Sequence, residues 1–203
     1  MGAKNATTQE ILAKSRDGYI DAADTAILVR TALKKAFPTV KFRVRTDKYS
    51  MGASIHVGWT DGPTPKQVEA VAVRFEGGRF DGMIDMAYDV SHYLTDSGDA
   101  ILRHNPGTVG SRGMDPGYDN PDLAGIFPVV HFGANYIFCD RSFSNPNLRE
   151  EIKAFIRAVF AETLQPYDLD SMAWRVMSNL DFLAGNTVEK TFRREILREE
   201  ATA

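Results

Sequence analysis

Apolar residues recur along this chain with two spacings, one typical of helices and one typical of strands. In residues 21–37 they return every three or four positions, which places them on one face of a helix. Asp24 or Thr25 is the expected N-cap. Pro38 ends this helix, because proline keeps the preceding residue out of the α region.

Two later segments alternate with period two. Residues 40–45 place apolar side chains on one face and basic side chains on the other, the basic ones being Lys41, Arg43 and Arg45. Residues 54–60 alternate again, with an apolar face made of Ile55, Val57 and Trp59. The connection, residues 47–53, is short and contains Gly52, so the two segments predict a β-hairpin.

After residue 60 the pattern predicts one helix, then further strands around a long irregular region, and finally helices. Thr64, Pro65 and Gln67 form a helix start, because threonine caps, proline suits the first turn and glutamine completes a capping box. Residues 81–95 predict a third strand. The segment 127–143 predicts a second hairpin that turns at Gly133-Ala134. Further helices are expected near 145–164, 169–183 and 187–200.

These elements predict the α+β class, with an antiparallel sheet built from hairpins, helices packed on one face and a helical C-terminal third. Residues 1–20 are expected to be a flexible tail. Residues 21–203 are expected to form a single domain with a sheet core, 21–144, and a helical part, 145–203. The region 94–126 is rich in Gly, Pro, Asp and Asn, and is long for a plain connection.

The composition bears on the cellular compartment in which the protein is expected. The 203 residues carry a formal charge of −3, and the single cysteine, Cys139, cannot form an internal disulfide. No apolar run reaches the roughly 18 residues that a membrane helix needs. We therefore expect a cytoplasmic protein that does not bind a membrane.

Charge is unevenly distributed. From Arg30 to Lys48 there are seven basic residues and one acid, whereas from Arg79 to Gly125 there are three arginines and eight aspartates. The predicted surface for nucleic acid or an acidic partner comprises Lys41, Arg43, Arg45, Lys48 and His56. A possible second contact loop comprises Arg112, Asp115 and Asp119. A solvated basic face without a ligand is the alternative.

No motif identifies a catalytic centre. The histidines lack metal-ligand spacing, and no phosphate-binding or nucleotide-binding glycine loop follows a strand. We therefore predict no metal and no cofactor. If the chain were an enzyme, the long loop would cover a site formed from His56, Asp61, His131 or Cys139.

Several quoted stretches carry a family resemblance: "AFPTVKFRVR", "YSMGASIHVGWTDGPT", "QVEA" and "FDGMID" within residues 32–89, and "NYIFCDRSFS" at 135–144. Together they resemble the large polyvalent protein-associated domains of phages, plasmids and integrative elements. The resemblance implies a mobile-element protein that acts inside the host cell. It supplies no catalytic residues.

Three hypotheses follow for function. The first is a non-catalytic binder that counteracts a host defence system by blocking a protein or nucleic-acid surface, with a host protein or protein–nucleic acid complex as partner. The second is a direct nucleic-acid-binding protein that uses the basic strand face. The third is an enzyme with a loop-covered site. The amphipathic C-terminal helices could also pair two copies as a homodimer.

Overall fold

The structure is a computed structural model that describes residues 6–104, 106–112, 122–160 and 164–198. Helices and mixed or antiparallel strands occur together, which confirms the α+β class. The chain divides into two compact units. We call residues 1–58 and 69–140 the sheet unit, and residues 59–68 and 141–203 the helical unit.

The N-terminal region is folded from residue 6 onward. Helix α1 (Ala6–Lys14) and the short strand β1 (Tyr19–Ile20) lie within the segment expected to be a flexible tail. Thr8 and Ile11 are buried, and Ile20 is 1% exposed. For residues 6–20 the expectation of a tail is therefore wrong, because a few buried side chains anchor a segment whose hydrophobic pattern is weak.

Helix α2 (Ala22–Ala36) begins one turn earlier than the expected cap. The carboxylate of Asp21 accepts a hydrogen bond from the amide of Asp24 at 2.8 Å, so Asp21 is the N-cap. Thr25 is buried, and its hydroxyl donates to the carbonyl of Asp21 at 2.7 Å. The helix ends at Phe37, before Pro38, as predicted.

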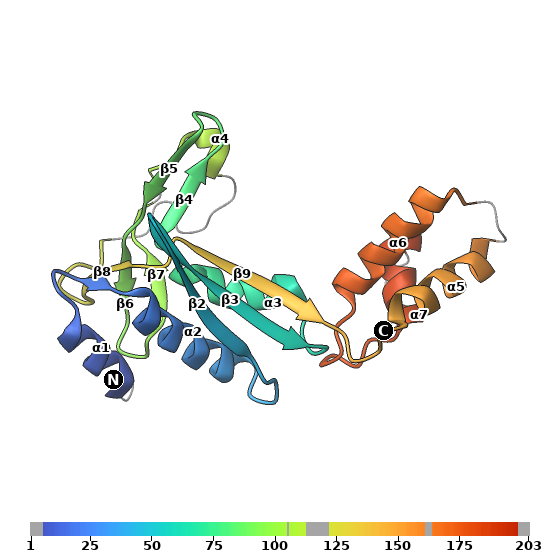
Figure 1. Ribbon diagram of the computed structural model, residues 1–203, viewed down its shortest axis with the longest axis horizontal. Helices are drawn as coiled ribbons and strands as arrows, with labels where there is room; N and C mark the ends of the chain where they lie inside the picture. The colour runs from blue at the N-terminus through green and yellow to red at the C-terminus, as the bar shows by residue number, and fades with distance from the viewer. Residues whose placement is uncertain (1–5, 105, 113–121, 161–163, 199–203) are drawn as a thin grey trace. The chain divides into compact units, whose positions relative to one another are not determined.

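The predicted hairpin is present and longer than expected. Strand β2 (Arg43–Tyr49) pairs in antiparallel register with β3 (Gly52–Thr60), with Arg45 opposite His56. The turn is reduced to residues 50–51. Strand β9 (Tyr136–Ser142) completes the sheet in the order β2-β3-β9, and runs in the same direction as β3 (Figure 1).

The second predicted hairpin is wrong. Strand β8 (Val129–Phe132) belongs to a different sheet from β9, with the order β1-β8-β6-β7, where β6 is His92–Leu94 and β7 is Ala100–Leu102. The backbone amides that follow β8 and precede β9 donate to different sheets. The amide of Gly133 donates to Ile20 at 2.7 Å, whereas the amide of Asn135 donates to Ala53 at 2.8 Å.

Residues 78–89 form a two-stranded ribbon rather than one strand, with β4 (Gly78–Asp81) antiparallel to β5 (Met86–Asp89). The buried carboxylate of Asp81 accepts from the amide of Thr108 at 2.6 Å and from its hydroxyl at 3.0 Å. These bonds hold the short helix α4 (Val109–Arg112) beside the ribbon. The long region 94–126 thus contains both β7 and α4.

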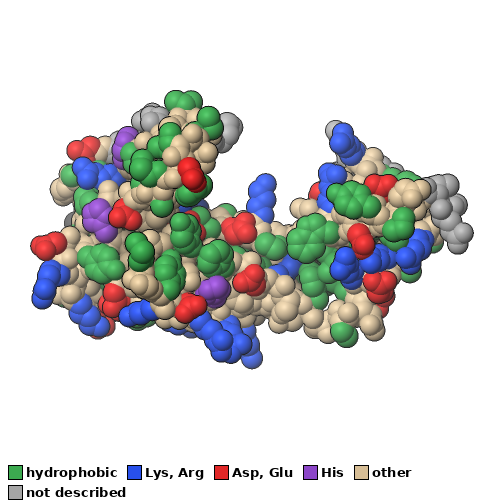
Figure 2. Space-filling view, turned by 45° about the horizontal axis from the view of Figure 1, so that its top comes forward, with side chains coloured by type: hydrophobic (Ala, Val, Ile, Leu, Met, Phe, Trp, Pro, Cys, Tyr) green, Lys and Arg blue, Asp and Glu red, His purple; other side chains and the backbone are tan. Residues whose placement is uncertain are grey.

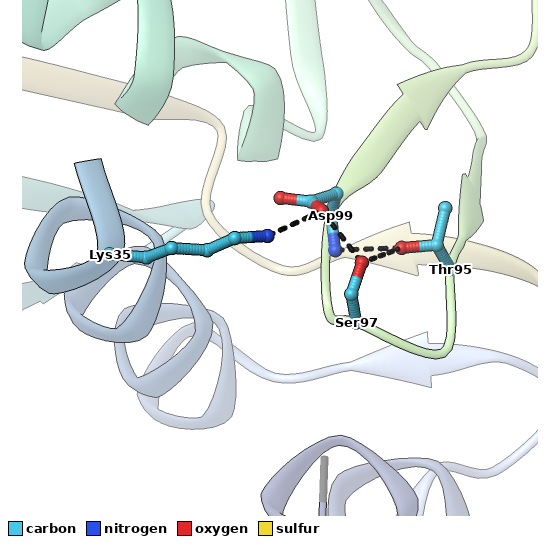
Figure 3. Close-up of polar contacts among 4 residues, drawn as sticks. All are labelled: Lys35, Thr95, Ser97 and Asp99. Atoms are coloured by element: carbon cyan, nitrogen blue, oxygen red, sulfur yellow. Dashed lines mark hydrogen bonds and ion pairs between the residues drawn. The ribbon is translucent and has the colours of Figure 1, made fainter. Parts of the chain in front are cut away.

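The turn between β6 and β7 is tied to the end of α2 (Figure 3). The carboxylate of Asp99 accepts from the Ser97 hydroxyl at 2.7 Å and from Nζ of Lys35 at 3.2 Å. Its amide donates to the Thr95 hydroxyl at 3.0 Å. One of the basic residues in the run from Arg30 to Lys48 therefore has an internal partner.

The helical unit is built around α5 (Leu148–Phe160), α6 (Pro166–Asn179) and α7 (Val188–Phe192), which continues into a wider turn at Arg193–Leu197. Its core comprises Leu148, Ile152, Ile156, Leu169, Ala173, Val176, Leu180 and Phe192. Helix α3 (Pro65–Ala72) and a 3₁₀ turn, Val73–Phe75, precede β4. No helix in the described ranges is long and apolar enough to cross a membrane.

Candidate nucleic-acid interface

One face of the β2-β3-β9 sheet is covered and the other is largely open. Alternation buries one set of side chains, including Val44, Ile55, Val57 and Ile137. The opposite set, which we call the outer sheet face, comprises Arg43, Arg45, Asp47, Ser54, His56, Gly58, Tyr136, Phe138 and Asp140. Of these, only Ser54 is buried.

The centre of the outer sheet face combines a cation with aromatic rings. Arg45 is exposed and lies opposite His56 in the register. The ring centroids of His56 and Phe138 are 5.1 Å apart, and that of Tyr136 is 6.3 Å from Phe138. Phe138 remains 48% exposed. Guanidinium, imidazole and phenyl groups thus form one row across three strands.

A half-buried carboxylate, that of Glu76, fixes the backbone between the two aromatic residues of β9. Oε1 of Glu76 accepts from the amide of Ile137 at 2.7 Å, and Oε2 accepts from Nη1 of Arg79 at 2.7 Å. Burial raises the pKa of Glu76, which the bonds from Ile137 and Arg79 partly counteract. This anchor holds Tyr136 and Phe138 in place from the inner side of the sheet.

The outer sheet face is not strongly basic. Asp47 lies on β2 between the arginine rows and the turn, and Asp140 follows Phe138 on β9; both are exposed. On the outer sheet face the charges of two arginines are therefore offset by those of two aspartates. A surface of this composition attracts a phosphate backbone weakly, and stacking on aromatic rings has to supply much of any affinity for nucleic acid.

The predicted contact residues are only partly brought together. Arg43, Arg45 and His56 share the outer sheet face, whereas Lys41 precedes β2 and lies outside any strand. Lys48 alternates to the other side and lines a pocket. Arg112 lies in α4, and Asp115 and Asp119 fall outside the described residues.

The aromatic half of the site was missed because 136–142 was assigned to a hairpin with 128–132. A signal was present in the sequence: Tyr136 and Phe138 are aromatic, although Ile137 between them already supplies an apolar side chain to the other face of the strand. A strand with apolar residues on both faces is either buried on both or presents an apolar surface to a ligand.

The residues considered for catalysis do not form a nucleophilic site. His131 lies on β8 and Cys139 on β9, in separate sheets. Burial, together with Glu69, Glu76 and Asp140, raises the pKa of Cys139 to about 12, so its thiol stays protonated near neutral pH. Asp61 accepts from the amide of Ser144 at 3.0 Å, a contact between the segments that follow β3 and β9. Within the described residues, no three His, Cys, Asp or Glu side chains gather as a metal site.

A second exposed surface is apolar. The β4–β5 ribbon and α4 expose Phe80, Met83, Ile84, Met86 and Val109, each more than half accessible. Figure 2 shows hydrophobic side chains gathered at this projecting end. Exposed apolar clusters are typical of protein-binding surfaces. The host protein expected as a partner stays a prediction.

The sequence matches the family described as large polyvalent protein associated domain 29 over residues 20–144. No curated protein and no solved structure shows a match to the chain. The matched range contains every strand of the outer sheet face, up to Ser142, and includes the stretches 32–89 and 135–144 that carry the resemblance. Because the match covers more than half of the 203 residues, the protein belongs to the large polyvalent protein associated domain 29 family, whose members are associated with mobile elements.

Proposed function

We propose that this protein binds single-stranded nucleic acid through the outer sheet face. The observation that carries the proposal is the row of Arg45, His56 and Phe138 across three strands, with the Phe138 ring 48% exposed. An exposed phenyl ring on a rigid sheet offers a stacking surface to any base. The neighbouring arginines offer donors to phosphate oxygens.

The spacing of the row suits a nucleotide. Arg45 and Phe138 are two strands apart, which is about 10 Å between their backbones. If a base stacks on Phe138 of β9, its phosphate lies within reach of the long guanidinium side chain of Arg45 on β2. Stacking contributes roughly 1–3 kcal/mol per base, and it is available only where bases are unpaired. With two aspartates offsetting two arginines, duplex DNA gains little from this surface.

The test is fluorescence anisotropy with labelled single strands of about 12 nucleotides, DNA and RNA, and a duplex of the same sequence. We expect tighter binding of the single strands. With two to four phosphate contacts, the slope of log affinity against log salt should be about −1.4 to −2.8. Phe138→Ala should weaken single-strand binding by about tenfold, since one stacked base is lost. Arg45→Glu should weaken it further.

Lys34→Glu is the matched control, because Lys34 is an exposed base on α2 rather than on the outer sheet face. It should leave the affinity within about twofold, the change expected from screened charge at a distance. Equal affinity for duplex and single strand, or an unchanged affinity for Phe138→Ala, would overturn the proposal.

Single-strand binding gives the anti-defence role implied by the resemblance a concrete form. A strand that enters a new host and is covered by this protein is withheld from host nucleases. We therefore expect wild-type protein to slow digestion of a single strand by a purified exonuclease, and Phe138→Ala to lose most of that protection. Digestion at the same rate with and without wild-type protein, at saturating concentration, would contradict this form of the role.

A further inference from the structure

A pocket of about 600 Å³ opens at the tip of the β2–β3 hairpin. Its wall includes two tyrosines from separate elements, Tyr19 of β1 and Tyr49 of β2, which are 55% and 48% exposed. Lys48 and Asp89, at the ends of β2 and β5, also line it. Two tyrosine rings, a lysine and an aspartate therefore line one space inside the sheet unit, and Asp21, His131 and Phe132 line it as well.

The walls of this pocket are closely packed. A Cβ atom on Gly133 would lie 2.5 Å from the Tyr19 hydroxyl oxygen, so that ring lies directly over bare backbone. A Cβ atom on Gly52 would lie 2.4 Å from Oδ1 of Asn135. That oxygen accepts from the amide of Ala53 at 3.2 Å. The pocket is thus shaped before a ligand arrives.

The charged groups of the pocket are available to a ligand. Neither Lys48 nor Asp89 forms an ion pair within the described part of the chain, and both are exposed. Asp21, which also lines the pocket, differs because its carboxylate caps α2. Lys48 can donate to a phosphate. Asp89 as a carboxylate only accepts hydrogen bonds, so it selects a ligand that presents an N–H or O–H group.

The pocket adjoins the outer sheet face at the hairpin tip, and Lys48, whose side chain alternates to the opposite side of β2, lines it as well. Alternation along β2 runs from Arg43 and Arg45 through Asp47 to Tyr49, and Gly52 is paired with Tyr49 across the turn. Tyr49 and Gly52 both line the pocket. A strand that follows β2 past the arginines therefore arrives at the pocket mouth.

We propose that the pocket receives one base of the bound strand, with the tyrosine rings against its faces and Asp89 accepting from its exocyclic amino group. This inference rests on the proposed function. It adds a base preference that stacking on Phe138 alone does not give. Cytosine, adenine and guanine carry such an amino group, whereas uracil and thymine offer only a ring N3–H between two carbonyl oxygens that a carboxylate repels. Lys48 contacts the adjoining phosphate.

The test compares deoxycytidine and deoxyuridine oligomers of equal length at one salt concentration and pH 7.5, again by anisotropy. Both bases are pyrimidines, but cytosine carries an amino group at C4 where uracil carries a carbonyl oxygen, which cannot donate to Asp89. We expect the cytosine strand to bind about fivefold tighter or more, as for one good polar contact to a base edge. Asp89→Ala should remove that difference, because alanine offers no acceptor to the amino group, and it should not weaken binding of the uracil strand.

Asp96→Ala is the control, because Asp96 is exposed and lies outside the pocket lining. It should keep the cytosine preference. Equal binding of both strands by wild type, or a preference that survives Asp89→Ala, would overturn the pocket assignment while the Phe138-dependent binding stands. If neither strand binds at low salt, both the proposed function and this inference fail, so the two failures are distinguishable.

Discussion

His92 is buried on β6 with both ring nitrogens unpartnered in the described part of the chain. Its ring packs on Phe132 with centroids 5.0 Å apart. Burial, reinforced by the charges of Arg79 and His131, lowers the pKa of His92 to about 3. The side chain is therefore neutral at pH 7 and packs as an aromatic group in the core of the four-stranded sheet.

This environment predicts how stability depends on pH. In the unfolded chain His92 has its ordinary pKa of about 6.5 and is protonated below that pH. In the folded chain its pKa is about 3, so it stays neutral until the pH falls that far. Between these two values the unfolded chain binds one more proton than the folded chain, so acid favours unfolding. The free energy of unfolding should thus fall as pH drops from 7 toward 3, by up to about 1.4 kcal/mol per unit from this residue. Replacing His92 with leucine should remove that loss.

The measurement is urea unfolding of wild type and His92→Leu at pH 7 and pH 5. At pH 5 the variant should gain about 2 kcal/mol on wild type from this cause, relative to the difference at pH 7. His104→Leu, at an exposed histidine, is the matched variant that measures how much of the gain comes from replacing any histidine with leucine. An identical pH dependence for wild type and His92→Leu would show that the folded protein accepts this proton.

At the scale of elements, the helices and strands that a local sequence pattern determines were predicted correctly. Helix α2 and the β2–β3 hairpin were found because their periods extend over many residues and their partners are adjacent in the chain. The side on which Arg43 and Arg45 lie followed from alternation alone. The N-cap is Asp21 rather than the predicted Asp24 or Thr25. All three residue types are good N-caps, so only the geometry of the first helical turn distinguishes them.

The errors lie where partners are distant. Strand β9 pairs with β3, about eighty residues earlier, and no feature of 136–142 shows that choice. Strands β1, β6 and β7 have two or three residues, too few for a period. The pocket was unpredictable for the same reason, since it combines β1, the hairpin tip and the end of β5 with residues near β8.

For the whole molecule, the division into units does not follow the chain order. Residues 59–68 belong with the helices that begin some eighty residues later. Arg141 connects these segments. Its guanidinium donates to the carbonyls of Leu180 at 2.7 Å and Pro63 at 3.2 Å, and also to that of Met177. It lies over the Phe143 ring, 4.7 Å from the centroid. One side chain thus joins both stretches of the helical unit.

Arg141→Leu should therefore destabilise the helical unit locally. The carbonyls of Pro63, Met177 and Leu180 lose a charged donor, and leucine replaces none of these bonds. We expect a loss of about 2–3 kcal/mol, the cost of one well-bonded charged group. Native-state hydrogen exchange should show it as faster exchange of the α6 amides, while the α2 amides in the sheet unit keep their wild-type protection.

Arg175→Leu provides the comparison, because Arg175 lies on α6 itself but is exposed, with its Glu195 partner 3.8 Å away. A surface ion pair of this kind contributes under about 1 kcal/mol, so α6 exchange should change little. If Arg141→Leu instead accelerates exchange equally in α2 and α6, the two units unfold as one cooperative body. Unchanged α6 exchange in Arg141→Leu would mean that the hydrophobic core around Ile152 and Phe192 stabilises the helices without this anchor.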